Sequence, residues 1–270
     1  MKYLLLIGLM INLIGCGDSP NKTETNLFPD GSYKLQKVQI TENDKATTEI
    51  RDQLKIYSNE RYMFAFMHPS IGVDVGAGIA IWKDGIMTEI PLFNHNGSVS
   101  GFEFDLSITQ TETGFTQSLT GLVSEDGSIL DMIEDWKTIS KQNSPYDGLW
   151  QLETTDLNPN MVSQIKMMGG SQFIELTRSK SGSDIQKQFN FGEFVVVRHG
   201  ADGSKSKNYS FSGTGIELPK KVREKITNSS HKNNIGEIKT LTYELNEDEL
   251  LVTSSSVPGG ETVIQKYKRI

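Results

Sequence analysis

Hydrophobic and polar residues alternate along much of the chain after residue 30. In the stretch 99–108, the apolar residues Phe102, Phe104, Leu106 and Ile108 alternate with polar ones. A period of two gives a strand one buried and one solvated face, which is typical of antiparallel sheets. The dipeptide Asp84-Gly85 lies between two apolar runs and predicts a tight hairpin. Many short strands separated by such turns favour an all-β sandwich or barrel.

The pattern occurs twice. The segment 30–35 recurs as 147–152, and each copy continues with a Gln-led apolar strand, at 53–57 and at 164–168. Each copy also ends on an aromatic strand, at 135–139 and 266–270. We therefore predict two domains, residues 29–140 and 147–270, joined by a polar linker at 141–146 that contains Pro145. Because each copy has its own first and last strand, we expect two separate folding units.

The segment 219–226 is the one helical candidate. Pro219 takes the position that favours a first helical turn, and Val222 and Ile226 are four residues apart, on one helix face. The interval around it is longer than the matching interval in the first copy, so we expect a helical insertion in the second domain, at about 213–234. Its basic residues are candidates for contact with an anionic membrane surface or with a ligand carboxylate or phosphate: Lys220, Lys221, Arg223 and Lys225.

The N-terminus reads as a targeting signal at residues 1–15. Lys2 precedes a short apolar run that is too short to span a membrane, and polar residues follow it directly. The run ends in Leu13-Ile14-Gly15-Cys16, which resembles the bacterial lipobox. That resemblance implies a lipidated Cys16, a tether at 16–28 and a location in the cell envelope; an ordinary secretory signal is the alternative. Gly17 after the cysteine favours the outer membrane, with the periplasmic or surface face left open.

The first-strand motif also suggests a family. Gly148 and Trp150 on the first strand, a meander of antiparallel strands and Arg269 on the last strand resemble a lipocalin-like barrel. The chain is similar overall to bacterial lipoproteins with tandem lipocalin-like domains. The resemblance implies two up-and-down barrels, with Trp150 packed under Arg269 to close the bottom of the second. The first copy has Tyr33 in place of the tryptophan and Lys137-Thr138 where the arginine is expected, so we expect a flatter or more open barrel there.

Composition removes several function classes. The 270 residues carry a net charge of −7, which gives no reason to expect nucleic-acid binding. Cys16 is the only cysteine, so disulfides and thiolate metal sites are excluded. The chain has no nucleophile elbow, phosphate loop or zinc-protease motif, and its four histidines lack ligand spacing. We therefore expect no catalytic residues, no metal and no cofactor.

The aromatic residues remain as candidates for a binding site. An eight-stranded barrel is either filled by its own side chains or holds one small ligand, and the sequence leaves both open. The hypothesis is a non-catalytic, membrane-anchored envelope lipoprotein that binds a small apolar or amphipathic molecule. The alternative is a scaffold or protein-interaction lipoprotein with filled barrels. The residues expected to line a cavity are Tyr33, Phe64, Phe104, Trp136, Trp150, Phe173, Phe191 and Tyr243.

Overall fold

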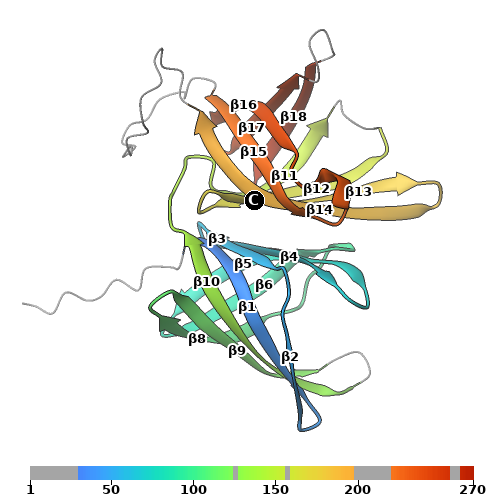
Figure 1. Ribbon diagram of the computed structural model, residues 1–270. Helices are drawn as coiled ribbons and strands as arrows, with labels where there is room; N and C mark the ends of the chain where they lie inside the picture. The colour runs from blue at the N-terminus through green and yellow to red at the C-terminus, as the bar shows by residue number, and fades with distance from the viewer. Residues whose placement is uncertain (1–29, 124–126, 156–158, 198–219, 256–261) are drawn as a thin grey trace, which may run out of the picture.

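The computed structural model describes residues 30–123, 127–155, 159–197, 220–255 and 262–270. Within these ranges the regular structure is β-strand, apart from a one-turn 3-10 helix at Lys232–Asn234. The strands form two consecutive eight-stranded antiparallel barrels, drawn in blue-green and in yellow-red (Figure 1). The prediction of an all-β chain with two barrels is confirmed, and the arrangement fits tandem lipocalin-like domains.

Barrel 1 is an up-and-down ring closed by pairing of its first and last strands, β1 and β10. Two short strands lie outside the ring: β2 (Lys45–Glu49) pairs with β1, and β7 (Gly97–Ser98) pairs with β6. The ring strands in order are β1 (Gly31–Glu42), β3 (Leu54–Ser58), β4 (Arg61–His68), β5 (Gly72–Lys83), β6 (Ile86–Asn94), β8 (Phe104–Thr111), β9 (Gly114–Val123) and β10 (Ile129–Ser140).

Among the described residues, barrel 2 is a closed ring of eight strands with no further strand paired to it. In barrel 1 the predicted turn at Asp84-Gly85 joins the fourth and fifth ring strands. The equivalent connection in barrel 2 is residues 198–219, which lie outside the described residues. The strands are β11 (Gly148–Thr155), β12 (Met161–Gly169), β13 (Gln172–Ser181), β14 (Asp184–Val197), β15 (Lys220–Ser229), β16 (Ile238–Asn246), β17 (Glu249–Ser255) and β18 (Thr262–Arg269).

The expected helical insertion is wrong. Residues 220–229 form β15, the fifth strand of barrel 2, which pairs with β14 and β16 and is needed to close the ring. Val222 and Ile226 are buried together with Glu224 between them, as the inward positions of a strand. A spacing of four is an even number, so it places two residues on one face of a strand as well as on one face of a helix.

The pairing register makes the two rings comparable position by position. β1 pairs Tyr33 with Thr138 in the way that β11 pairs Trp150 with Arg269. The Gly-x-aromatic motif of the first strand therefore occupies the same place in each ring. We call the end of each barrel where its first strand begins and its last strand ends the linker end.

The barrels share a buried apolar core in addition to their separate interiors. The outer faces of β3, β4 and β5 pack against those of β12, β13 and β14, the corresponding strands of the second ring (Figure 1). Burial of each of the larger apolar side chains is worth about 1.5–3 kcal/mol, so this contact stabilises the arrangement of the barrels. Its members are Leu54, Ile56, Met63, Ala65, Val75, Ala77, Leu149, Ile165, Met167, Ile174, Leu176, Phe189 and Phe191.

Hydrogen bonds around this core are reciprocal. The β3–β4 turn reaches the linker end of barrel 2, where Asn59 Nδ2 donates to the Asp147 carbonyl at 3.2 Å. The β12–β13 turn reaches the linker end of barrel 1, where Ser32 Oγ donates to the Gly170 carbonyl at 2.8 Å. Equivalent surfaces face each other, as in a two-fold dimer. Independent folding of the two halves stays a prediction, and the shared core is the surface that separation would expose.

Candidate functional site

Each barrel interior contains a buried lysine paired with a glutamate. In barrel 1, Lys55 Nζ lies 2.8 Å from Glu89 Oε1 and donates to Gln117 Oε1 at 3.1 Å. The Tyr57 hydroxyl donates to the same glutamate oxygen at 2.6 Å. Buried charges persist only where they are paired and hydrogen-bonded, so this cluster fixes the second ring strand against the fifth.

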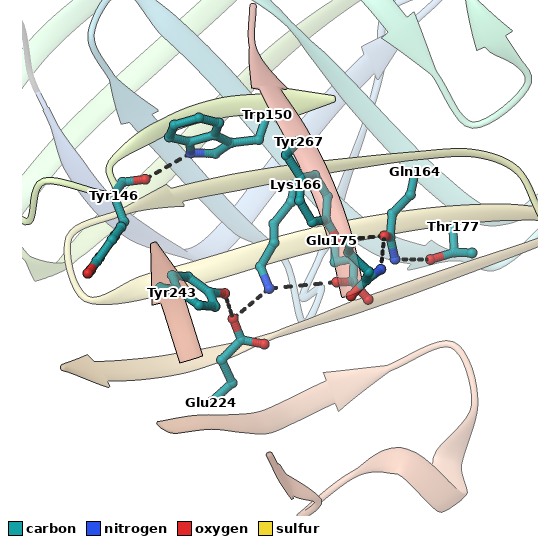
Figure 2. A network of polar contacts seen from close by, with 10 residues as sticks. Tyr146, Trp150, Gln164, Lys166, Glu175, Thr177, Glu224, Tyr243 and Tyr267 are labelled. Carbon is teal, nitrogen blue, oxygen red and sulfur yellow. Dashed lines mark hydrogen bonds and ion pairs between the residues drawn. The ribbon is translucent and has the colours of Figure 1, made fainter. Parts of the chain in front are cut away.

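Barrel 2 repeats the pair on its own second and fifth ring strands, and Figure 2 shows Lys166 and Glu224 with their neighbours. Lys166 Nζ on β12 lies 2.5 Å from Glu224 Oε1 on β15 and 3.7 Å from Glu175 Oε2. The Tyr243 hydroxyl donates to the same Glu224 oxygen. Burial alone lowers the pKa of Lys166, but Glu224 and Glu175 outweigh it and raise that pKa above its ordinary value. Lys166 is therefore a protonated structural cation and not a free amine nucleophile.

Aromatic rings occupy much of the remaining interior. In barrel 1 the rings of Tyr33 and Phe115 meet edge to face with centroids 4.8 Å apart, and Phe115 stacks on Trp136 at 6.3 Å. Such contacts are worth about 0.5–1.5 kcal/mol each beyond the area that they bury. Side chains of the protein itself therefore fill the middle of this barrel.

The eight aromatic residues expected to line a cavity lie in three different places. Five are fully buried in the barrel interiors: Tyr33, Trp136, Trp150, Phe173 and Tyr243. Phe64 is half-buried and packs against the interior cluster of barrel 1. Phe191 belongs to the core shared by the barrels, and Phe104 is half-buried on β8. Of the eight, only Tyr33 lines the pocket described next.

A partly enclosed pocket of about 510 Å³ lies at the linker end of barrel 1. It combines four apolar or aromatic side chains with charged, hydroxyl and amide ones, and its volume falls within the range of small-molecule sites. The lining residues are Asp30, Tyr33, Trp82, Ile108, Gln110, Thr111, Glu112, Gly114, Phe115, Thr138, Lys141 and Asn143.

The linker end of barrel 2 is filled instead. The Tyr146 ring is fully buried and perpendicular to that of Tyr243, with centroids 5.2 Å apart. The Tyr146 carbonyl accepts from Trp150 Nε1 at 2.8 Å (Figure 2). The Arg269 guanidinium lies 4.2 Å from the Trp150 ring centroid and donates to the Asp147 carbonyl at 2.5 Å. This is the contact that the lipocalin-like resemblance implies.

Smaller residues take the corresponding positions in barrel 1. From the register, Ile108 corresponds to Tyr243 and Thr138 to Arg269, and both line the pocket. The position of Tyr146 corresponds in sequence to Pro29, which lies outside the described residues. The pocket of barrel 1 is thus lined at positions where barrel 2 carries bulky side chains.

Lys141 from the linker replaces the missing arginine over the first-strand aromatic ring. Its Nζ lies 4.7 Å from the Tyr33 ring centroid and donates to the Tyr33 hydroxyl. In both barrels the cation crosses a glycine of the first strand. A Cβ on Gly31 would lie 2.8 Å from Lys141 Cδ, and one on Gly148 would lie 2.7 Å from Arg269 Nη1. Glycine is therefore needed at this position of the Gly-x-aromatic motif, because any larger residue would collide with the side chain of the cation.

The charges in the pocket wall are partly desolvated. Asp30 Oδ1 is shielded from solvent and has no hydrogen-bond partner among the described residues. Burial raises the pKa of Asp30, although the Asn59 amide and the Lys141 charge oppose the rise. Burial lowers the pKa of Lys141, and the Asp30 charge opposes that change. An unpaired, shielded carboxylate oxygen is unfavourable and gains from any donor that reaches it.

Sequence reasoning did not single out Asp30, Trp82 or Lys141. The sequence feature that points to this pocket is the replacement of the Trp–Arg pair of barrel 2 by Tyr33 and Thr138 in barrel 1. It indicates that the linker end of barrel 1 is packed differently. The ring is nevertheless closed, because β1 pairs with β10. What differs is the filling of the ring's end and not the ring itself.

The predicted anionic-contact residues lie on β15. Lys221, Arg223 and Lys225 are exposed on the outer face of barrel 2, whereas Lys220 is half-buried. β15 belongs to the sheet of barrel 2, and none of these four residues lines the pocket of barrel 1. Cys16, the signal segment and the tether lie outside the described residues.

Two further features of the described residues bear on function. No group of three or more His, Cys, Asp or Glu side chains among them is placed to hold a metal ion. None of the helices in this part of the chain is long and apolar enough to cross a membrane.

Comparison with known proteins gives one structural likeness. No family model and no curated protein matches the chain. The chain is similar to an uncharacterized protein of Saccharomyces cerevisiae of known structure, with 13% identity and a TM-score of 0.45. The match covers 88% of this chain and 98% of that one. A likeness at this level carries no functional argument.

Proposed function

We propose that the protein is a non-catalytic, lipid-anchored envelope lipoprotein that binds a small amphipathic molecule at the linker end of barrel 1. The observation that carries the proposal is the 510 Å³ pocket there, at positions that barrel 2 fills with Tyr243 and Arg269. The barrel interiors are not the binding site in this proposal, because the buried lysine pairs and aromatic rings occupy them.

A sealing variant tests the proposal. Ile108→Tyr combined with Thr138→Arg gives barrel 1 the side chains of barrel 2, and it should leave the ring closed while removing the pocket. Native mass spectrometry of the full-length protein from its own host, in detergent, should show a retained small molecule in the natural protein but not in the variant. The matched control is Val252→Thr, a change in the filled interior of barrel 2, which should retain the molecule. Equal retention by the sealing variant would overturn the proposal.

The filled interiors favour one second candidate, a scaffold whose barrels serve only to present an outer surface. The natural protein would then carry no small molecule, and the sealing variant would keep the full biological activity of the protein. The two candidates therefore differ in the same experiment.

Membrane anchoring at Cys16 is part of the proposal and is supported by the lipobox-like sequence alone. Cys16→Ser should accumulate as unprocessed precursor and be lost as a mature lipoprotein from the membrane fraction. A processed and membrane-bound Ser variant would contradict anchoring at this residue. Two or more acyl chains are what stable anchoring requires.

A further inference from the structure

We infer that the pocket of barrel 1 selects small amphipathic molecules that carry one protonated amine, held beside Asp30 with the apolar body against Trp82 and Phe115. The inference rests on the proposed function and adds the chemical class of the ligand. Three independent features of the pocket carry it: an unpaired carboxylate oxygen, the charge balance of the wall, and the aromatic residues in the wall.

The carboxylate supplies the specific contact. Asp30 Oδ1 is shielded and without a hydrogen-bond partner among the described residues, while Oδ2 accepts only a long bond of 3.4 Å from the Asn59 amide. The terminal torsion of aspartate is soft, so a small rotation presents either oxygen to the pocket. A charged donor makes a shorter and stronger hydrogen bond with a carboxylate than a neutral donor does.

The charge balance favours a cation over an anion. The pocket wall contains two carboxylates, Asp30 and Glu112, and one ammonium, that of Lys141. Lys141 donates to the Tyr33 hydroxyl and lies over the Tyr33 ring, and its single charge offsets only one of the two carboxylates. The domain around the pocket, residues 29–140, carries 8 basic and 17 acidic residues. Its field therefore raises the local concentration of cations at the mouth.

The apolar wall sets the shape of the rest of the ligand. Trp82 and Ile108 are half-buried beside the fully buried rings of Phe115 and Tyr33. Aromatic faces attract a nearby cation as well as an apolar body. A compact aromatic or branched aliphatic monoamine satisfies both halves of this wall, whereas a fatty acid would place its carboxylate among carboxylates.

Three nearly isosteric probes test the inference on the protein without its signal segment, residues 17–270, which keeps both barrels. They are 2-phenylethylamine, 2-phenylethanol and 3-phenylpropionate, measured by isothermal titration calorimetry at pH 7. We expect the amine to bind about tenfold more tightly than the alcohol, as a charge-assisted bond implies, and the acid to bind most weakly. Asp30→Asn should remove this preference and leave the affinity for the alcohol within about twofold.

Two controls localise the effect. Asp184→Asn removes one exposed carboxylate from barrel 2 and should leave the preference for the amine intact. In the described part of the chain, Trp82 is the one tryptophan that lines the pocket, and Trp136 and Trp150 are buried in the interiors. The fluorescence change caused by the amine should therefore vanish in Trp82→Phe.

The outcomes separate the inference from the proposed function. Equal affinity for the three probes, or an Asp30→Asn variant that still prefers the amine, overturns the inference and leaves the pocket as a binding site. No binding of any probe, together with no fluorescence change, overturns both.

Discussion

The two barrels have the same frame and different ends. Each ring places a lysine on its second strand against a glutamate on its fifth, and each starts with a glycine crossed by a cation. At the linker end, however, barrel 2 is filled by Tyr146, Tyr243 and Arg269, whereas barrel 1 has a pocket. A repeat can therefore keep the interactions that define its ring and change the few side chains that decide whether its end is open.

The source of one tyrosine hydroxyl explains why barrel 1 can have Ile108 where barrel 2 has Tyr243 and still keep its buried lysine–glutamate pair. In barrel 2 the hydroxyl that donates to the glutamate comes from Tyr243, at the filled end. In barrel 1 it comes from Tyr57, on the strand that also carries the lysine. Because Tyr57 satisfies Glu89, Ile108 at the position of Tyr243 needs no polar group, and the end is free to open.

Breaking either buried pair should have the largest effect. Lys55→Met and Lys166→Met each leave a buried glutamate without its cation, and each should lower the free energy of unfolding by about 3–5 kcal/mol. Urea unfolding followed by fluorescence measures this loss. Lys166→Met with Glu224→Gln, and the matching pair in barrel 1, should recover most of it, since glutamine still accepts from tyrosine. Single variants that cost less than about 1 kcal/mol would show that the pairs do not hold the frame.

Opening barrel 2 should have the next largest effect. Tyr146→Ala removes a fully buried ring and should cost about 3 kcal/mol, with a new pocket at the linker end of barrel 2. Urea unfolding gives the cost, and calorimetry with 2-phenylethanol should detect a second binding site. Tyr146→Phe keeps the ring and should show neither change. An alanine variant that stays as stable as the natural protein would mean that Tyr146 does not fill the end.

Asp147, at the linker end of barrel 2, should make the stability of the protein depend on pH. Burial raises the pKa of Asp147 to about 6, and hydrogen bonds from Ser144 only partly oppose this. The folded state thus holds its proton more tightly than the unfolded state, whose value is near 3.8. The associated stability is present below about pH 4 and is lost as the pH rises through about 6, an effect of about 3 kcal/mol.

Urea unfolding between pH 4 and pH 7 measures this slope. Asp147→Asn should flatten it, because asparagine does not titrate in this range. Asp30, the equivalent residue of barrel 1, has its pKa raised in the same direction, so Asp30→Asn provides the comparison. An unchanged slope in Asp147→Asn would place the titrating group elsewhere.

The smallest effect on stability is expected on the outer face of barrel 2. Replacing Lys221, Arg223 and Lys225 by serine should shift the melting temperature by no more than about 2 °C, since exposed charges stabilise little. Binding to anionic vesicles should weaken, because each basic side chain near such a surface contributes about 1 kcal/mol. Vesicle co-sedimentation at low salt measures it.

A matched triple replacement on barrel 1 controls for total charge. Lys45, Lys83 and Lys137 are exposed there, and serine at these positions should leave vesicle binding nearly unchanged. Equal weakening by both triples would mean that only net charge matters and that β15 is not the side that faces the membrane.

Much of the fold followed from local pattern. The period-two alternation, the Asp-Gly turn and the recurrence of 30–35 at 147–152 predicted two antiparallel barrels. The prediction of a helix at 219–226 is wrong, because Val222 and Ile226 share a face in either a helix or a strand. Only its pairing with β14 and β16 makes it a strand.

The sequence by itself determined the β class, the repeat and the Gly-x-aromatic frame, because these depend on residues close along the chain. The tertiary structure decided which distant residues meet: Lys55 with Glu89, Lys166 with Glu224, and the outer faces of β3–β5 with those of β12–β14. It also decided that one barrel end is a pocket. The physical reason is that strand register and ring closure, which no short window of sequence encodes, set which side chains share a volume.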